Sequence, residues 1–183
     1  MACLYCASSI LYVSSFVVIF CAWASLNLTF DLLIKNIRSH TEVFVHRDFH
    51  SRNLMFCNGE QGENPGILDF QDAVKGSIVY DLVSLFKDAY IVWEEEQIID
   101  WLIRYWESAK KNGLKVQEDF AEFYRDFEWM GVQRHLKVLG IFARLNYRDH
   151  KANYLNDLPS VENYLRKACE RYRELRPLLN MIN

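Results

Sequence analysis

Two short polar segments, each following an apolar run, constrain this chain more than any other feature. The first is His46–Asn53, with the sequence HRDFHSRN, and the second is Asp69–Gln71. Between them, residues 58–66 are rich in Asn, Gly and Pro, which are typical of turns. The sequence therefore predicts two short strands joined by a loop. Such a hairpin brings Asn53 close to Asp69, whereas on one helix these residues would lie about 24 Å apart.

The two segments carry three side chains suited to phosphoryl transfer, a reaction that depends mainly on positioning and charge neutralisation. One carboxylate must orient the attacking hydroxyl and accept its proton, while an amide and a second carboxylate hold Mg2+, which prefers oxygen ligands. The spacing fits the pattern H-R-D-x-x-x-x-N followed by Asp-Phe-x. We therefore expect Asp48 to be the catalytic base and Asn53 and Asp69 to bind the metal.

Three further residues are expected to support this loop. His46 and His50 lie within it, and Asp81 lies in the first turn of a helix that begins at residue 80. An acid at that position suits the helix dipole. A compatible alternative is a buried carboxylate that hydrogen-bonds the backbone of the loop and fixes its shape.

Most of the remaining chain is predicted to be helical. Apolar residues recur at helical intervals over residues 31–38 and 98–111, from about 118 to 148 with a kink or break at Gly131, and over 161–175, where Pro177 follows. The expected fold is mainly α with a small β-hairpin.

The longest predicted helix carries the candidates for substrate binding. Trp129, Gln133 and Arg134 put polar groups on a helix that is expected to be partly buried, as a pocket for a small-molecule acceptor requires. For each of the three, an ordinary core or surface position is the alternative interpretation.

Length and composition bound the function classes. With 183 residues, 51% of them hydrophobic, the chain is long enough for one domain with a real core. Its 21 Lys and Arg against 24 Asp and Glu give a net charge of -3, so no nucleic-acid partner is expected. Five scattered cysteines do not form a disulfide framework, which favours a reducing, cytoplasmic compartment.

The amino-terminal segment has a different character. Residues 1–30 carry no charged side chain, and residues 10–28 are apolar enough to be considered as a membrane span. No Lys or Arg precedes this run to set an orientation, so a wholly buried helix is the alternative to a membrane anchor. A boundary near residue 30 separates this apolar head, residues 1–29, from the rest of the chain, residues 30–183.

The motifs resemble those of a known superfamily. At HRDFHSRN, LDFQDA and YDLVSL the chain is similar to the aminoglycoside phosphotransferase and choline kinase-like superfamily, relatives of protein kinases. The phrases VFVHRDFHSRNLM, LDFQDAV, YDLVSLFKDAY and FEWMGVQRHLKVLGIFARL further resemble bacterial cell-wall-recycling kinases that phosphorylate N-acetylmuramate and N-acetylglucosamine at the anomeric hydroxyl.

This resemblance covers approximately residue 30 to the end and implies a protein-kinase-like carboxy-terminal lobe. It implies ATP and Mg2+ as cofactors and an amino sugar as substrate. It also matches Asp48 to the family's base and Asn53 and Asp69 to its magnesium ligands.

The expected amino-terminal lobe of such a kinase is missing. That lobe carries a glycine-rich phosphate loop, a strand lysine and a helix glutamate, but no Gly precedes Asp48 and Lys35 lies on a helical run. Three explanations compete: a truncated or misassembled reading frame, which we favour, a fragment that acts with a separate polypeptide supplying the nucleotide lobe, and a degenerate member kept for binding. We expect little turnover from this chain alone.

Two rival functions are weighed against the kinase. His46-x-Asp48-x-His50 on an extended chain would put three metal ligands on one face, as in a metal-dependent hydrolase. Only His40, His135 and His150 remain to complete such a site. The other rival is a non-catalytic pseudokinase that binds a sugar or a partner through its helices.

Overall fold

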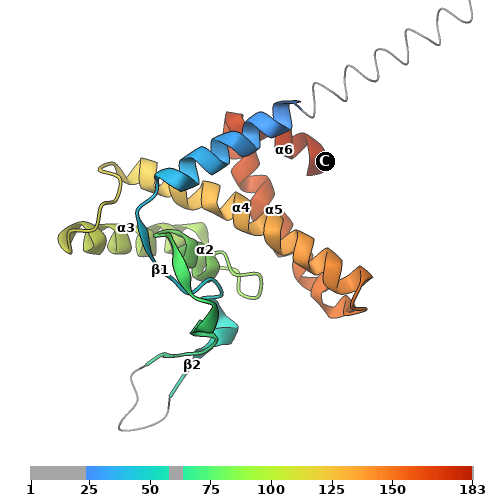
Figure 1. Ribbon diagram of the computed structural model, residues 1–183, viewed down its shortest axis with the longest axis horizontal. Helices are drawn as coiled ribbons and strands as arrows, with labels where there is room; N and C mark the ends of the chain where they lie inside the picture. The colour runs from blue at the N-terminus through green and yellow to red at the C-terminus, as the bar shows by residue number, and fades with distance from the viewer. Residues whose placement is uncertain (1–23, 58–63, 183) are drawn as a thin grey trace, which may run out of the picture.

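The structure of the protein is a computed structural model that describes residues 24–57 and 64–182. It is mainly helical, and its strands form two small antiparallel sheets (Figure 1). The expected mainly α fold with a small β-hairpin is therefore confirmed. Most of the apolar head at residues 1–29, including most of the candidate membrane span at 10–28, lies outside the described residues. Within the described ranges, no helix is both long and apolar enough to cross a bilayer.

The elements have the following bounds. The chain is helical over residues 24–39 and then in α2 (Tyr80–Phe86), α3 (Glu95–Lys111), α4 (Phe120–Tyr147), α5 (Leu158–Arg171) and α6 (Arg176–Ile182). The strands are β1 (Glu42–Val45), β2 (Leu54–Met55), β3 (Gly66–Ile67) and β4 (Val74–Ser77). Short 3-10 turns cover Ser51–Asn53, Phe70–Asp72, Ala152–Asp157 and Arg173–Leu175.

The two strand pairs place the polar segments of the sequence. β2 pairs with β3 in antiparallel register, with Leu54 opposite Ile67, so the predicted hairpin is confirmed. β1 pairs with β4, with Val45 opposite Val74 and Glu42 opposite Ser77. β4 therefore ends beside the start of β1, and α2 begins three residues later. From the first turn of α2, the side chain of Asp81 reaches the backbone of His46, where the HRD motif begins.

α4 is continuous where the sequence predicts an interruption. Every residue from Phe120 to Tyr147 is helical, so the break predicted at Gly131 is wrong. Gly131 is buried, and a Cβ built there would lie 3.7 Å from a ring carbon of His135 and 3.8 Å from Lys87 Cδ. Tertiary packing of this kind offsets the roughly 1 kcal/mol by which glycine disfavours a helix.

The carboxy-terminal helix is divided differently from the prediction. α5 ends at Arg171, a 3-10 turn follows, and α6 begins at Arg176. Pro177 therefore lies in the first turn of α6, where a proline is tolerated because the N–H at this position needs no helical partner. The sequence predicts that Pro177 ends one helix, whereas it lies at the start of the next.

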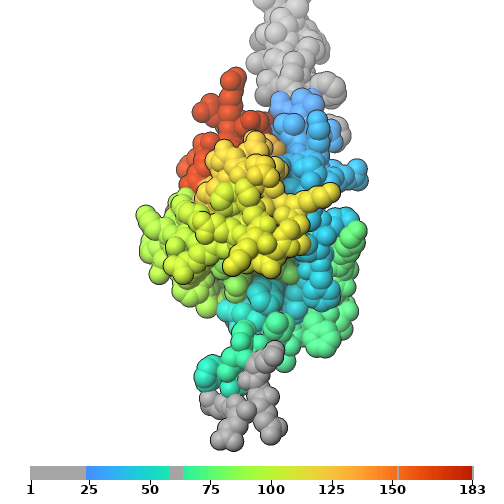
Figure 2. Space-filling model, turned by 90° about the vertical axis from the view of Figure 1, so that its left-hand side faces the viewer, coloured from blue at the N-terminus to red at the C-terminus, as the bar shows by residue number. Residues whose placement is uncertain are grey.

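Two hydrophobic clusters hold these elements together, and α4 contributes to both. In one, Trp129 and Val132 of α4 pack with Leu33 of the first helix and with Leu165 of α5. In the other, α4 packs through Phe123 and Phe127, and the remaining buried members are Ile78, Val79, Val83, Ile98, Leu102 and Met130. Figure 2 shows α3 and the segment that follows it on the face of the molecule turned toward the viewer.

Candidate active site

The loop from residue 46 to residue 53 is held in shape by the carboxylate of Asp81. The backbone N–H of His46 donates to Asp81 Oδ2 at 2.6 Å, and that of Arg47 donates to Oδ1 at 3.0 Å. Arg47 has a φ of 78°, a left-handed conformation that non-glycine residues seldom adopt. Because both neighbouring N–H groups point at one carboxylate, Asp81 stabilises this turn. Asp81 therefore hydrogen-bonds the backbone of the loop, as the second of the two sequence-based interpretations predicts.

A second carboxylate, which sequence analysis missed, holds the other end of the loop. Asp88 is 4% exposed, and its Oδ2 accepts from the backbone N–H of Ser51 at 3.0 Å and from the Ser51 hydroxyl at 2.6 Å. Its Oδ1 accepts from the N–H of Tyr90 at 3.2 Å, two residues along, as in an Asx turn. That local pattern after α2 is the one signal in the sequence that could have indicated Asp88.

His46 connects the loop to the second polar segment. Its side chain is buried, and Nε2 lies 2.8 Å from the carbonyl oxygen of Leu68, so this nitrogen carries the hydrogen and donates it. The ring also makes an edge contact with Phe49, with 5.8 Å between centroids. His46 thereby fixes the residue that precedes Asp69.

The hairpin places Asn53 next to the segment that carries Asp69. Leu68 N donates to Asn53 O at 3.0 Å, and Asn53 Nδ2 donates to Asp48 O at 2.9 Å. Asp69 is exposed, has a φ of 64°, and accepts from Gln71 Nε2 at 3.1 Å. One amide oxygen and one accessible carboxylate fit the sparse protein ligation that Mg2+ combines with water and phosphate oxygens.

The rival metal-hydrolase site does not form. Over residues 24–57 and 64–182, no three His, Cys, Asp or Glu side chains are placed to hold a metal ion together. His46 is turned inward toward Leu68, whereas Asp48 is exposed. The left-handed turn at Arg47 removes the alternation of an extended chain on which that prediction depended.

A cavity of about 180 Å³ opens beside Asp48. Its polar wall contains Asp48 and His50 from the loop, Asp88 and Tyr90 from the segment after α2, and Arg134 from α4. Its remaining lining residues are Lys87, Ala89, His135, Val138, Ile141, Phe142, Leu145, Tyr154 and Val161. A mostly apolar cavity with a few convergent polar groups is typical of a small-molecule site.

Burial beside this cavity favours a neutral His50. Burial lowers the pKa of His50, and the positive charges of Arg134 and Arg52 add to that effect, while the carboxylates of Asp88 and Asp48 oppose it. His50 makes an edge contact with the Tyr90 ring at 5.6 Å, and the Arg52 guanidinium lies over that ring, 3.4 Å from its centroid. A neutral imidazole can act as either donor or acceptor toward a bound molecule.

Of the three residues proposed for substrate binding, Arg134 lines the cavity, and Trp129 and Gln133 do not. Trp129 is 7% exposed and packs in the cluster around Leu33, whereas Gln133 is exposed. Successive residues of a helix point about 100° apart, so neighbours on α4 face different surroundings. Arg134 also donates from Nη1 to the carbonyl oxygen of Arg47 at 3.1 Å, which ties α4 to the loop.

Buried charges anchor the segment that carries Asp88. Lys87 Nζ lies 3.2 Å from Glu128 Oε1, and Arg171 Nη1 lies 2.8 Å from Glu128 Oε2. Burial lowers the pKa of Lys87, and the Glu128 charge opposes this. His135 Nε2 lies 3.4 Å from the carbonyl oxygen of Lys87, and burial next to the Lys87 charge lowers the pKa of His135 to about 3.

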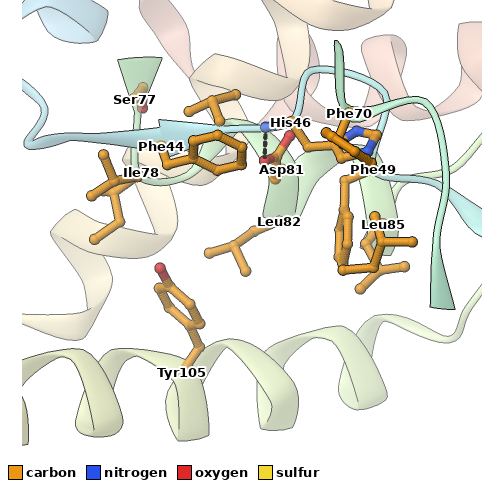
Figure 3. A pocket seen from close by; sticks show the side chains of 13 residues that line it. Phe44, His46, Phe49, Phe70, Ser77, Ile78, Asp81, Leu82, Leu85 and Tyr105 are labelled. Carbon is orange, nitrogen blue, oxygen red and sulfur yellow. Dashed lines mark hydrogen bonds between the residues drawn. The ribbon is translucent and has the colours of Figure 1, made fainter. Parts of the chain in front are cut away.

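A second, larger cavity of about 500 Å³ has Asp81 in its wall (Figure 3). Its walls are mostly apolar, and they include Phe44, Ile78, Leu82, Leu85 and the ring of Tyr105 from α3. Burial raises the pKa of Tyr105, with a smaller contribution from the Asp81 charge. The apolar walls lower the local dielectric around the Asp81 contacts, which strengthens those hydrogen bonds.

Comparison with known proteins identifies the family. A model of the phosphotransferase enzyme family matches residues 16–120, which is more than half of the chain. The chain belongs to this family. The resemblance found in the motifs is confirmed, and the protein is a phosphotransferase by family. The match begins at residue 16, inside the segment 1–29 that the sequence analysis set apart.

Three curated relatives carry the name N-acetylmuramate/N-acetylglucosamine kinase. The one from Neisseria meningitidis is 56% identical over 154 residues, which cover 84% of this chain and 45% of the relative. Those from Pseudomonas putida and Pseudomonas aeruginosa are 45% and 46% identical over 152 and 148 residues, covering 83% and 81% of this chain and 44% and 43% of the relatives. The chain thus spans less than half the length of these phosphotransferases.

Proposed function

We propose that this chain is the acceptor-binding part of an ATP-dependent kinase that phosphorylates a hydroxyl of an amino sugar, with N-acetylmuramate and N-acetylglucosamine as candidates. The names of the relatives supply the class of sugar. The observation that carries the proposal is the position of Asp48, which lines the cavity beside α4 on a loop held by Asp81 and Asp88. A base must lie within hydrogen-bond reach of the hydroxyl it activates.

In this proposal Asp48 accepts the proton of the sugar hydroxyl. Its carboxylate is exposed at the cavity, while its backbone carbonyl accepts from Asn53. Asp81 and Asp88 restrain the loop at its two ends, which fixes the position of the base before the sugar arrives. Restraint of this kind converts binding energy into correct orientation of the reacting groups.

Asn53 and Asp69 would hold Mg2+. Both offer oxygen donors, and both belong to segments joined by the β2–β3 pair. When bound, the metal neutralises charge on the phosphate oxygens of ATP. His46 keeps Asp69 in place through its hydrogen bond to Leu68, and Gln71 orients the carboxylate of Asp69.

The contacts to ATP itself are proposed to come from outside this lobe. A kinase of this type covers the phosphates with a glycine-rich loop and pairs a strand lysine with a helix glutamate. The sequence before Asp48 contains no glycine. We therefore expect the 183 residues to bind the sugar but to turn it over only when a nucleotide-binding segment is supplied, either on the same polypeptide or as a separate one.

The test joins this chain to the missing part. Residues 30–183 replace the matching half of the Neisseria meningitidis relative, and a coupled ADP-release assay follows turnover with each sugar, ATP and Mg2+. We expect the chimera to be active and Asp48→Asn to lower kcat by about 10²- to 10⁴-fold, the usual contribution of a general base. Full activity of the Asp48→Asn chimera would refute the role of this carboxylate.

A non-catalytic sugar-binding fragment is the second candidate. The observation in its favour is that the loop, the segment after α2 and α4 of this chain together form the acceptor cavity and its supporting contacts. Calorimetry on the 183-residue chain separates the candidates. Sugar binding without measurable ATP binding, together with an inactive chimera, would favour the fragment, whereas an active chimera would favour the kinase.

A further inference from the structure

Two cations of α4 converge on one hydroxyl, and one of them, Arg134, lines the acceptor cavity. Lys137 Nζ lies 3.2 Å from the phenolic oxygen of Tyr80, and Arg134 Nη1 lies 3.5 Å from the same atom. Both cations also lie over the Tyr80 ring, at 5.9 and 5.5 Å from its centroid. The two residues are three apart on one helix and therefore share a face.

These cations have no counter-ion in the part of the chain that the structure describes. Neither Arg134 nor Lys137 has a carboxylate within 4.0 Å there, and their contacts are the neutral oxygens of Tyr80 and Arg47. Lys87, by contrast, is paired with a carboxylate at 3.2 Å. Arg134 is 8% exposed, and a buried charge without a partner is costly. The cluster is therefore complementary to an anion.

The position of the cluster points to the acceptor as the source of that anion. Arg134 lines the same cavity as Asp48, and the charges of both act on His50, which lies in the cavity wall. The cluster also donates to the carbonyl oxygen of Arg47, the residue directly before Asp48. An anionic substituent held here would belong to a molecule whose hydroxyl is near the base.

We propose that Arg134, Lys137 and Tyr80 bind a carboxylate carried by the acceptor and so favour an acidic amino sugar over its neutral counterpart. This inference rests on the proposed function. N-acetylmuramate carries a carboxylate on its lactyl ether, whereas N-acetylglucosamine has a hydroxyl there. Charge-assisted hydrogen bonds from lysine and arginine are the strong ones for carboxylates, and Tyr80 can donate its own hydrogen.

The same arrangement accommodates a neutral sugar. Lys137 is half-buried, so water can reach its ammonium group when no carboxylate is present. A neutral sugar leaves the cations hydrated rather than stranded, and its binding is weaker but not abolished. The cluster is therefore expected to set a moderate preference rather than an absolute one.

Calorimetry with the full 183-residue chain and each sugar tests the proposal. We expect Lys137→Gln to weaken binding of N-acetylmuramate by about fivefold to twentyfold, the range for a partly exposed charge-assisted contact. Binding of N-acetylglucosamine should stay within about twofold, and Lys137→Arg should restore most of the loss. Added salt should weaken the binding of N-acetylmuramate but not that of N-acetylglucosamine, because salt screens charge. Tyr80→Phe should weaken the binding of N-acetylmuramate less than Lys137→Gln does.

The matched control is Arg104→Gln, which removes an exposed cation of α3 that pairs with Asp100. It should change neither affinity. Equal loss of both sugars in Lys137→Gln, or an unchanged affinity for N-acetylmuramate, would overturn the proposal while leaving the kinase function standing. If Lys137→Gln loses affinity for inorganic phosphate while its affinity for N-acetylmuramate is unchanged, the proposal is overturned in favour of a phosphate site. If the unsubstituted chain binds neither sugar, the proposed function fails, and this inference fails with it.

Discussion

Asp81→Asn separates the two roles that the sequence allows for this carboxylate. If Asp81 served only the dipole of α2, its loss would cost about 0.3–1 kcal/mol. In the structure it also accepts from the N–H groups of His46 and Arg47, at 2.6 and 3.0 Å. A hydrogen bond to a charged group contributes about 1.5–3 kcal/mol. The two roles therefore predict different magnitudes.

The magnitude follows from the chemistry of the replacement. An asparagine keeps one acceptor oxygen and turns an NH2 group toward the second backbone N–H, so one bond is lost and one donor is left unsatisfied. We expect the free energy of unfolding to fall by about 2–4 kcal/mol. For a chain of this length that corresponds to a decrease in Tm of about 4–16 °C.

Urea denaturation measures the loss, and amide hydrogen exchange locates it. The N–H groups of His46 and Arg47 should exchange faster relative to the global rate in the variant. Asp100→Asn is the control, because its ion pair with Arg104 is exposed and should contribute at most about 0.5 kcal/mol. A loss of less than about 1 kcal/mol in Asp81→Asn, with unchanged exchange at the two amides, would refute the loop-holding role.

Three further substitutions test the surroundings of the cavity. Asp88→Ala should cost about 1–3 kcal/mol and speed amide exchange at Ser51, since it removes the acceptor of two bonds from that residue. Glu128→Gln should lower the free energy of unfolding by about 3 kcal/mol in urea denaturation, because it leaves the buried ammonium of Lys87 without its counter-charge. Burial lowers the pKa of His135 to about 3, so the unfolded chain binds a proton near pH 6.5 that the folded chain does not. Stability should therefore fall as the pH drops from about 6.5 toward 3, by about 1 kcal/mol per pH unit, and this slope should be smaller in His135→Gln.

Local patterns explain how much of the site could be predicted from the sequence. The loop residues and the hairpin are encoded within residues 43–70, where apolar runs and turn residues alternate, and the β2–β3 pair follows from them. The roles assigned there to Asp48, Asn53 and Asp69 remain proposals. Their placement in an exposed loop and an adjacent strand pair is what the pattern predicts.

The contacts that could not be predicted join segments far apart in the chain. Asp88 meets Ser51 across 37 positions, and Arg134 meets Tyr80 across 54. No periodicity encodes such pairs, because they depend on how α2 and the segment after it pack against the loop and against α4. The same packing keeps Gly131 helical, against its low propensity. The sequence therefore predicts the loop and its support by Asp81, whereas the role of Asp88 and the convergence of Arg134 and Lys137 on Tyr80 required the tertiary structure.

The position of α4 in both hydrophobic clusters has a consequence for how the chain unfolds. Two separate cores could in principle melt one after the other, leaving a partly folded state with half of the helices intact. Since Val132 belongs to one cluster and Phe127 to the other, a single rigid helix transmits the loss of either core to its neighbour. The lobe should therefore behave as one cooperative unit, in which the acceptor cavity persists only as long as both cores do.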